Sequence, residues 1–99
     1  MPKYVFAYRI PNNYQPGQPG ATGAWVAWFK ELGSHVADRG NPVFSSTTLG
    51  ESGSSTSIGG YSLVTADDLE SAVSLAKGSP GLAVGGGVEV GEITELLPA

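Results

Sequence analysis

Two side chains in this 99-residue chain have the chemistry of an acid–base pair, His35 and Asp38. Histidine is the side chain whose unperturbed pKa lies close to neutrality, and His35 is the only histidine present. If both residues lie on one helix, this spacing places them on the same face, where the carboxylate would orient the imidazole as a general base. A histidine stabilised at the C-terminal end of a helix has the same spacing. The structural interpretation is favoured, because such pairs are common at helix ends.

Composition excludes most other site chemistry. The sequence has no cysteine, which rules out disulfides, thiolate nucleophiles and cysteine-ligated zinc. A single histidine rules out a multi-histidine metal site within one chain. Ser34, beside His35, forms no nucleophile triad, because neighbouring residues on one helix point in different directions. We therefore expect neither a metal nor a cofactor.

The charge balance argues against nucleic-acid and membrane partners. Nine acidic and five basic residues give a formal net charge of −4, and the basic residues do not cluster. Nucleic acids and anionic membranes both attract a basic stripe. No apolar stretch approaches the roughly 18 residues that span a bilayer, and residues 1–10 lack the features of a signal peptide. We therefore expect a cytoplasmic protein.

Residues 3–10 (KYVFAYRI) alternate as a strand. One face carries aromatic side chains at every second position, and the other carries Val5 and Ala7, so both faces need covering. Residues 11–23 are a long connector rich in proline and glycine, typical of either a surface loop or a lid.

A tryptophan-bearing helix is predicted next. From Trp25, apolar residues recur at i, i+3, i+4, i+7 and i+11, which is one face of a helix over residues 24–39. Thr22 is its expected N-cap, and Gly40 is its expected C-terminal stop.

Four further elements complete the chain. Residues 42–49 and 58–65 are predicted strands that would form a hairpin, and Gly59-Gly60 indicates a bulge or a close backbone approach. Residues 67–77 form a predicted helix that Asp67 caps and Gly78 ends. Residues 87–93 are the last predicted strand.

The order βαββαβ predicts an α+β, ferredoxin-like fold, with a four-stranded antiparallel sheet and two helices on one face. This arrangement leaves the other sheet face bare. Since the first strand is apolar on both sides, we expect a second copy of the chain to cover that face in a homodimer.

Weak motifs follow one another in a specific order along the second half of the chain. They are a Gly-Gly-aromatic strand start at residues 59–61, an Asp-x-x-x-Ala helix, a Ser-Pro turn at residues 79–80 and a Gly-x-Val-Glu-Val strand. Together with the aromatic first strand, they make residues 1–99 resemble a single YCII-related domain, of the branch named for an Asp-Gly-Pro-Phe motif.

This resemblance implies a homodimer of the dimeric α/β-barrel type. In the YCII type a catalytic pair has been proposed, with a histidine early in the first helix and an aspartate just before a proline. Trp25 and Ser79 stand at the matching positions, and neither indole nor hydroxyl can replace those groups. The Asp-Gly-Pro-Phe motif is also absent. The sequence therefore favours a protein that is not an enzyme.

Three functions stay open. The leading hypothesis is a non-catalytic dimeric module that binds a small apolar or aromatic metabolite, or a protein partner. In related families the sheet and the first helix enclose a cavity. Here we expect its wall to include Tyr8, Trp25, Trp28, His35 and Tyr61. The alternative is a small cofactor-free enzyme for a lactone, aromatic or peroxide substrate, with His35 as general base helped by Asp38 or Tyr61. A purely structural assembly piece would instead have a filled core.

Overall fold

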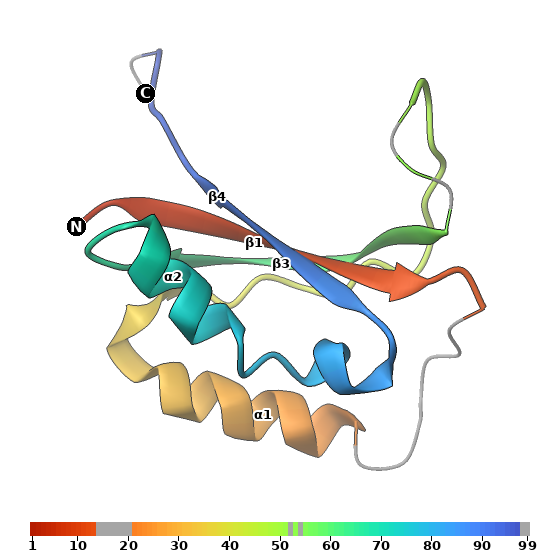
Figure 1. Cartoon of the computed structure of the whole chain (residues 1–99). Helices are drawn as coiled ribbons and strands as arrows, with labels where there is room; N and C mark the ends of the chain where they lie inside the picture. Colours follow the sequence, from red (N-terminus) through yellow and green to blue (C-terminus); the bar gives the residue numbers. More distant parts are fainter. Residues whose placement is uncertain (14–20, 52, 54, 98–99) are drawn as a thin grey trace.

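The computed structural model describes residues 1–13, 21–51, 53 and 55–97, which form an α+β fold around one antiparallel sheet. The sheet order is β2-β3-β1-β4, and helices α1 and α2 lie on the same face (Figure 1). The elements are β1 (Lys3–Pro11), α1 (Ala21–Leu32), η1 (Gly33–His35), β2 (Val36–Asp38), β3 (Thr56–Thr65), α2 (Leu69–Ala76), η2 (Pro80–Val84) and β4 (Gly87–Glu92). The predicted class, antiparallel sheet and βαββαβ order are confirmed, and the arrangement is compatible with the ferredoxin-like fold.

Strand β1 runs through the interior of the sheet, and its alternation builds the core. Tyr4, Phe6 and Tyr8 are buried beneath the helices, whereas Val5 and Ala7 are half-buried on the opposite face. The other buried hydrophobic residues come from both helices, from β3 and from the residue after it: Trp28, Leu32, Val64, Ala66, Ala72 and Ala76. This division of β1 into two faces is the one that its sequence predicts.

The first helix is shorter than predicted. It ends at Leu32, because Gly33 adopts a φ of +55°, a left-handed conformation that glycine adopts without steric cost. The predicted helix over residues 24–39 is therefore wrong in its second half, which forms η1 and β2. Thr22 lies inside the first turn and is not the N-cap. Most of the predicted connector, residues 14–20, lies outside the described residues, so the choice between loop and lid stays open.

The predicted strand over residues 42–49 is wrong. This segment forms only an isolated bridge between Pro42 and Gly60, and β2 instead pairs with β3. Proline has no amide hydrogen for a ladder, and the run Ser45 to Thr48 has no apolar side chains to bury against the sheet. The hairpin is therefore replaced by a short strand and a long irregular segment.

Helix α2 starts one residue after its cap. The cap is Asp68, not Asp67 as predicted, and its Oδ1 accepts a hydrogen bond of 2.8 Å from the Ser71 amide. This bond holds the pKa of the Asp68 carboxyl below its usual value. The helix ends at Ala76, just before Gly78. Among the described residues, no helix is long and apolar enough to span a membrane.

Candidate functional site

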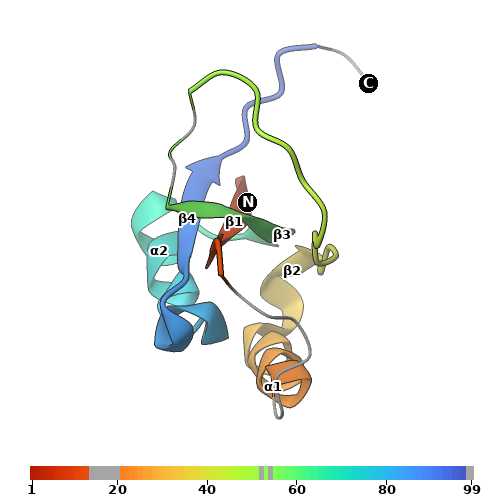
Figure 2. The same ribbon diagram turned by 90° about the vertical axis from the view of Figure 1, so that its right-hand side faces the viewer.

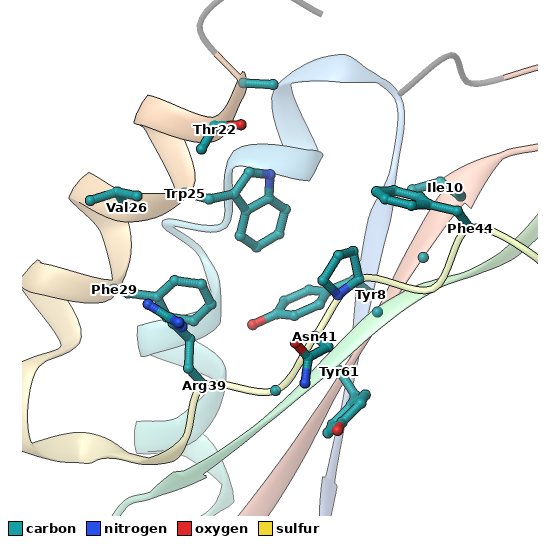
Figure 3. Close-up of a pocket in the computed structure, with 15 residues that line it drawn as sticks. Tyr8, Ile10, Thr22, Trp25, Val26, Phe29, Arg39, Asn41, Phe44 and Tyr61 are labelled. Carbon is teal, nitrogen blue, oxygen red and sulfur yellow. The ribbon is translucent and has the colours of Figure 1, made fainter. Parts of the chain in front are cut away.

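A pocket lies where α1 faces the end of β1 and the start of β3 (Figure 3). Its volume is about 430 Å³. The segment from Arg39 to Phe44 closes the remaining side. The residues that line it are mostly apolar: Tyr8, Ile10, Ala21, Thr22, Trp25, Val26, Phe29, Arg39, Gly40, Asn41, Pro42, Phe44, Gly59, Gly60 and Tyr61.

Packed aromatic rings form one wall of the pocket. Trp25 meets Tyr8 edge-on, with ring centroids 4.8 Å apart, and lies 6.0 Å from Phe29. Behind them, buried Trp28 contacts all three rings and stacks on Phe6. Edge-to-face pairs of this kind add about 0.5–1.5 kcal/mol each beyond the burial of their area. The wall is therefore held in place by rings that do not themselves touch the cavity.

The floor of the pocket is a glycine bulge in β3. Tyr8 pairs with Gly60 and Arg9 pairs with Ile58, so Gly59 is the extra residue and the predicted bulge is confirmed. Gly60 has a φ of +155°, and a Cβ there would lie only 3.0 Å from the Asn41 carbonyl oxygen. The main chain at Asn41 can therefore pack directly against the strand.

Tyr8 connects this floor to Arg39 through hydrogen bonds. Its hydroxyl donates to Ser62 Oγ at 2.8 Å, and Ser62 Oγ donates to the Arg39 carbonyl oxygen at 2.6 Å. Burial raises the pKa of Tyr8 to about 12, against the lowering effect of the Ser62 hydrogen bond. Tyr8 is therefore neutral at physiological pH, and its hydroxyl hydrogen is already donated to Ser62.

His35 and Asp38 each bind backbone atoms. His35 Nδ1 lies 2.9 Å from the Thr65 carbonyl oxygen, and Asp38 Oδ1 accepts from the Gly40 amide at 2.8 Å. The helix that would have aligned them ends at Leu32. Neither residue lines the pocket. A catalytic role for either one stays a prediction.

The predicted wall residues divide into three groups. Tyr8 and Trp25 line the pocket, and Trp28 lies in the core behind them. Tyr61 also borders the pocket, although it pairs with Ala7 on the opposite sheet face and its ring points away from the pocket in Figure 3. Binding of a ligand by these four residues stays a prediction.

Ser79 and Trp25 both lie beside Gly81. A Cβ placed on Gly81 would be 3.8 Å from Trp25 Cζ2 and 4.0 Å from Ser79 Oγ, so both side chains approach Gly81. Ser79 is only 4% exposed, and its hydroxyl has no hydrogen-bond partner among the described residues. The two positions that the YCII resemblance pairs therefore border the same glycine.

The irregular segment supplies the wall residues that sequence reasoning missed, Arg39, Asn41 and Phe44. No periodicity marks them, because they lie outside the regular elements. The turn sequence Gly40-Asn41-Pro42 was the available signal, since such residues interrupt helices and strands.

Comparisons with known protein families, curated proteins and solved structures gave no match to this chain. The residues that line the pocket are therefore the guide to what it can bind. Among the described residues that line the pocket there is no carboxylate, histidine or lysine. The described part of the chain also holds no group of three or more acidic or histidine side chains suited to a metal ion. The pocket offers flat apolar walls and a few hydrogen-bonding groups.

Proposed function

We propose that this chain is a non-catalytic binding module for a small, flat, apolar or aromatic molecule, and that it works as a homodimer. The observation that carries the proposal is the pocket walled by Trp25, Tyr8 and Phe29. Its volume of about 430 Å³ lies in the range of about 300–1,000 Å³ that is usual for small-molecule sites.

The chemistry of the lining supports binding rather than turnover. General acid–base catalysis needs a group that titrates near the working pH within hydrogen-bond reach of the substrate. Tyr8 has a pKa of about 12, and its hydrogen is engaged with Ser62. His35, the residue that the enzymatic alternative requires, lies outside the lining.

Membership of a YCII-like family belongs to the same proposal. It is supported by the element order and by the approach of both Trp25 and Ser79 to Gly81. A tryptophan and a serine at the positions of the proposed His–Asp pair replace two groups that could transfer protons with an aromatic ring and a hydroxyl. A binding role fits that exchange of side chains.

The homodimer is supported by the bare sheet face. Neither helix covers it, and the register places Val5 with Leu63 and Ala7 with Tyr61 on that side. The described residues of the segment between β2 and β3 and of the C-terminal tail project beyond this face (Figure 2). They carry the most exposed leucines, Leu49 at 91% and the pair Leu96 and Leu97 at about 85%. Apolar side chains exposed to this degree favour a protein partner.

Native mass spectrometry with the neutral dye N-phenyl-1-naphthylamine tests both parts. At low micromolar protein we expect a dimer that takes up one dye per chain. Phe44→Ser removes a wall residue that is 67% exposed, so it should spare the fold and weaken binding roughly fivefold, the loss of about 1 kcal/mol of aromatic contact.

Leu69→Ser is the matched control, because Leu69 is also exposed but lies on α2 outside the pocket. It should leave dye affinity unchanged. Absence of saturable uptake, or equal weakening by both variants, would refute the binding site. A persistent monomer would refute the dimer and leave the pocket standing.

A further inference from the structure

Arg39 is the single charged side chain among the described residues that line the pocket. All the other polar side chains of the lining, such as Thr22 and Asn41, are neutral. The chain as a whole is acidic, with a formal net charge of −4. An isolated cation beside aromatic rings is therefore the main electrostatic feature of this site.

Within the described residues, the guanidinium of Arg39 has no carboxylate partner. The acid next to it in sequence, Asp38, binds the Gly40 amide through Oδ1 at 2.8 Å. An arginine presents five N–H donors in a planar fork that matches a carboxylate. With no partner among the described residues, these donors can meet an anion that enters the pocket.

The main chain that carries Arg39 is fixed on both sides. Its carbonyl oxygen accepts the 2.6 Å hydrogen bond from Ser62 Oγ. Gly40 follows with a φ of +72°, and a Cβ there would collide with the Tyr61 carbonyl oxygen. The base of the side chain therefore needs little reorganisation on binding, which favours affinity.

The donors and the rings come from different elements of the pocket. Arg39 and Asn41 rise from the segment after β2, while Trp25 comes from α1 and Tyr8 from β1 (Figure 3). Tyr8 cannot donate to a ligand, because its hydrogen is engaged with Ser62. A ligand that places an anionic acceptor group towards Arg39 and Asn41 can lay its apolar part against the rings.

From this geometry, and resting on the proposed binding function, we propose that the ligand class is a flat aromatic carboxylate. Its ring packs against Trp25 and Tyr8. Its carboxylate accepts hydrogen bonds from the Arg39 guanidinium, with the Asn41 amide as a second donor. Charge-assisted pairs of this kind are stronger than neutral hydrogen bonds, and water at the exposed Arg39 moderates the gain.

Two probes of the same shape test the proposal, 2-naphthoate and the neutral 2-naphthamide, titrated by calorimetry into the full chain. We expect the naphthoate to bind roughly fivefold to tenfold more tightly at low salt, and this preference should shrink as salt is raised. Arg39→Gln should reduce naphthoate affinity to the naphthamide value and leave naphthamide unchanged. Arg39→Lys should keep part of the preference, because it retains the charge without the planar fork.

Lys30→Gln is the charge control, because Lys30 is an exposed cation of α1 outside the lining. It should leave both affinities unchanged. Equal binding of the two probes, or a preference that survives Arg39→Gln, would overturn the carboxylate assignment and leave the aromatic pocket standing. If neither probe binds, the carboxylate assignment fails together with the proposed function.

Discussion

Helices α1 and α2 cover the same sheet face with side chains of very different size. Helix α2 presents two fully buried alanines, Ala72 and Ala76, and lies close to the strands (Figure 1). Helix α1 presents Trp25, Trp28 and Phe29 and lies farther from the sheet. Small residues let a helix backbone approach its neighbour, whereas rings hold it away.

The difference explains where the cavity forms. Beneath the last turns of α1, Trp28 and Leu32 fill the space between helix and sheet. Beneath its first turns, Gly59 and Gly60 of the bulge have no side chains to fill the space, and the pocket opens there. The groove beside α2 is smaller, about 240 Å³. The pocket therefore results from rings on the helix combined with glycines on the strand.

Trp28→Ala should have the largest effect on the packing of α1 against the sheet. Trp28 is 4% exposed and contacts Phe6, Tyr8, Trp25 and Phe29, so its loss leaves a large cavity. We expect the free energy of unfolding, measured by urea titration, to fall by about 3–5 kcal/mol. Trp25→Ala should cost less, because one side of Trp25 already faces the pocket. If Trp25→Ala lowered the free energy of unfolding as much or more, Trp28 would not be the residue that contributes most to the packing of α1.

Ala72→Leu tests the α2 side of the comparison. Ala72 is fully buried, and extra methylenes there should push α2 off the strands at a cost of about 1–3 kcal/mol. Ala21→Leu makes the same increase in size on α1, but beside the open pocket, and should change stability by no more than about 0.5 kcal/mol. Equal costs in urea denaturation would mean that the two interfaces do not differ in tightness.

The sequence predicted the elements whose residue pattern fits only one type of secondary structure. Alternation in β1 placed Tyr4, Phe6 and Tyr8 in the core, and the predicted acidic cap of α2 is one residue from the observed cap. Val36 shows where periodicity fails. Its spacing from Trp25 continues the helical face, yet a β-branched residue equally suits a strand, and the positive φ of Gly33 decides for β2.

The site was only partly predictable for a related reason. Tyr8 and Trp25 belong to periodic elements, so their place beside the cavity could be inferred. Tyr61 borders the cavity, but its register opposite Ala7 directs its ring to the other face of the sheet. Arg39 and Asn41 lie in an irregular segment whose path depends on contacts with Gly60 and Ser62, far away in sequence. Local pattern carries no information about such contacts.

Tyr8→Phe should cost less than Trp28→Ala, and it tests the hydrogen bonds that join the pocket to the sheet. The ring stays in place, and Ser62 still donates to the Arg39 carbonyl oxygen. Only the 2.8 Å bond from the Tyr8 hydroxyl is lost. At neutral pH we therefore expect the free energy of unfolding to fall by about 1 kcal/mol.

The same variant should change the response to alkaline pH. Because burial raises the pKa of Tyr8 from 10.0 to about 12, the folded state keeps its proton in a range where the unfolded state loses it. The stabilisation from Tyr8 is therefore complete below pH 10 and declines between pH 10 and pH 12, by up to about 1.4 kcal/mol per pH unit. Across this range the wild type should lose more stability than Tyr8→Phe in urea titrations. Parallel pH profiles would show that the Tyr8 hydroxyl is exposed to water and not buried against Ser62.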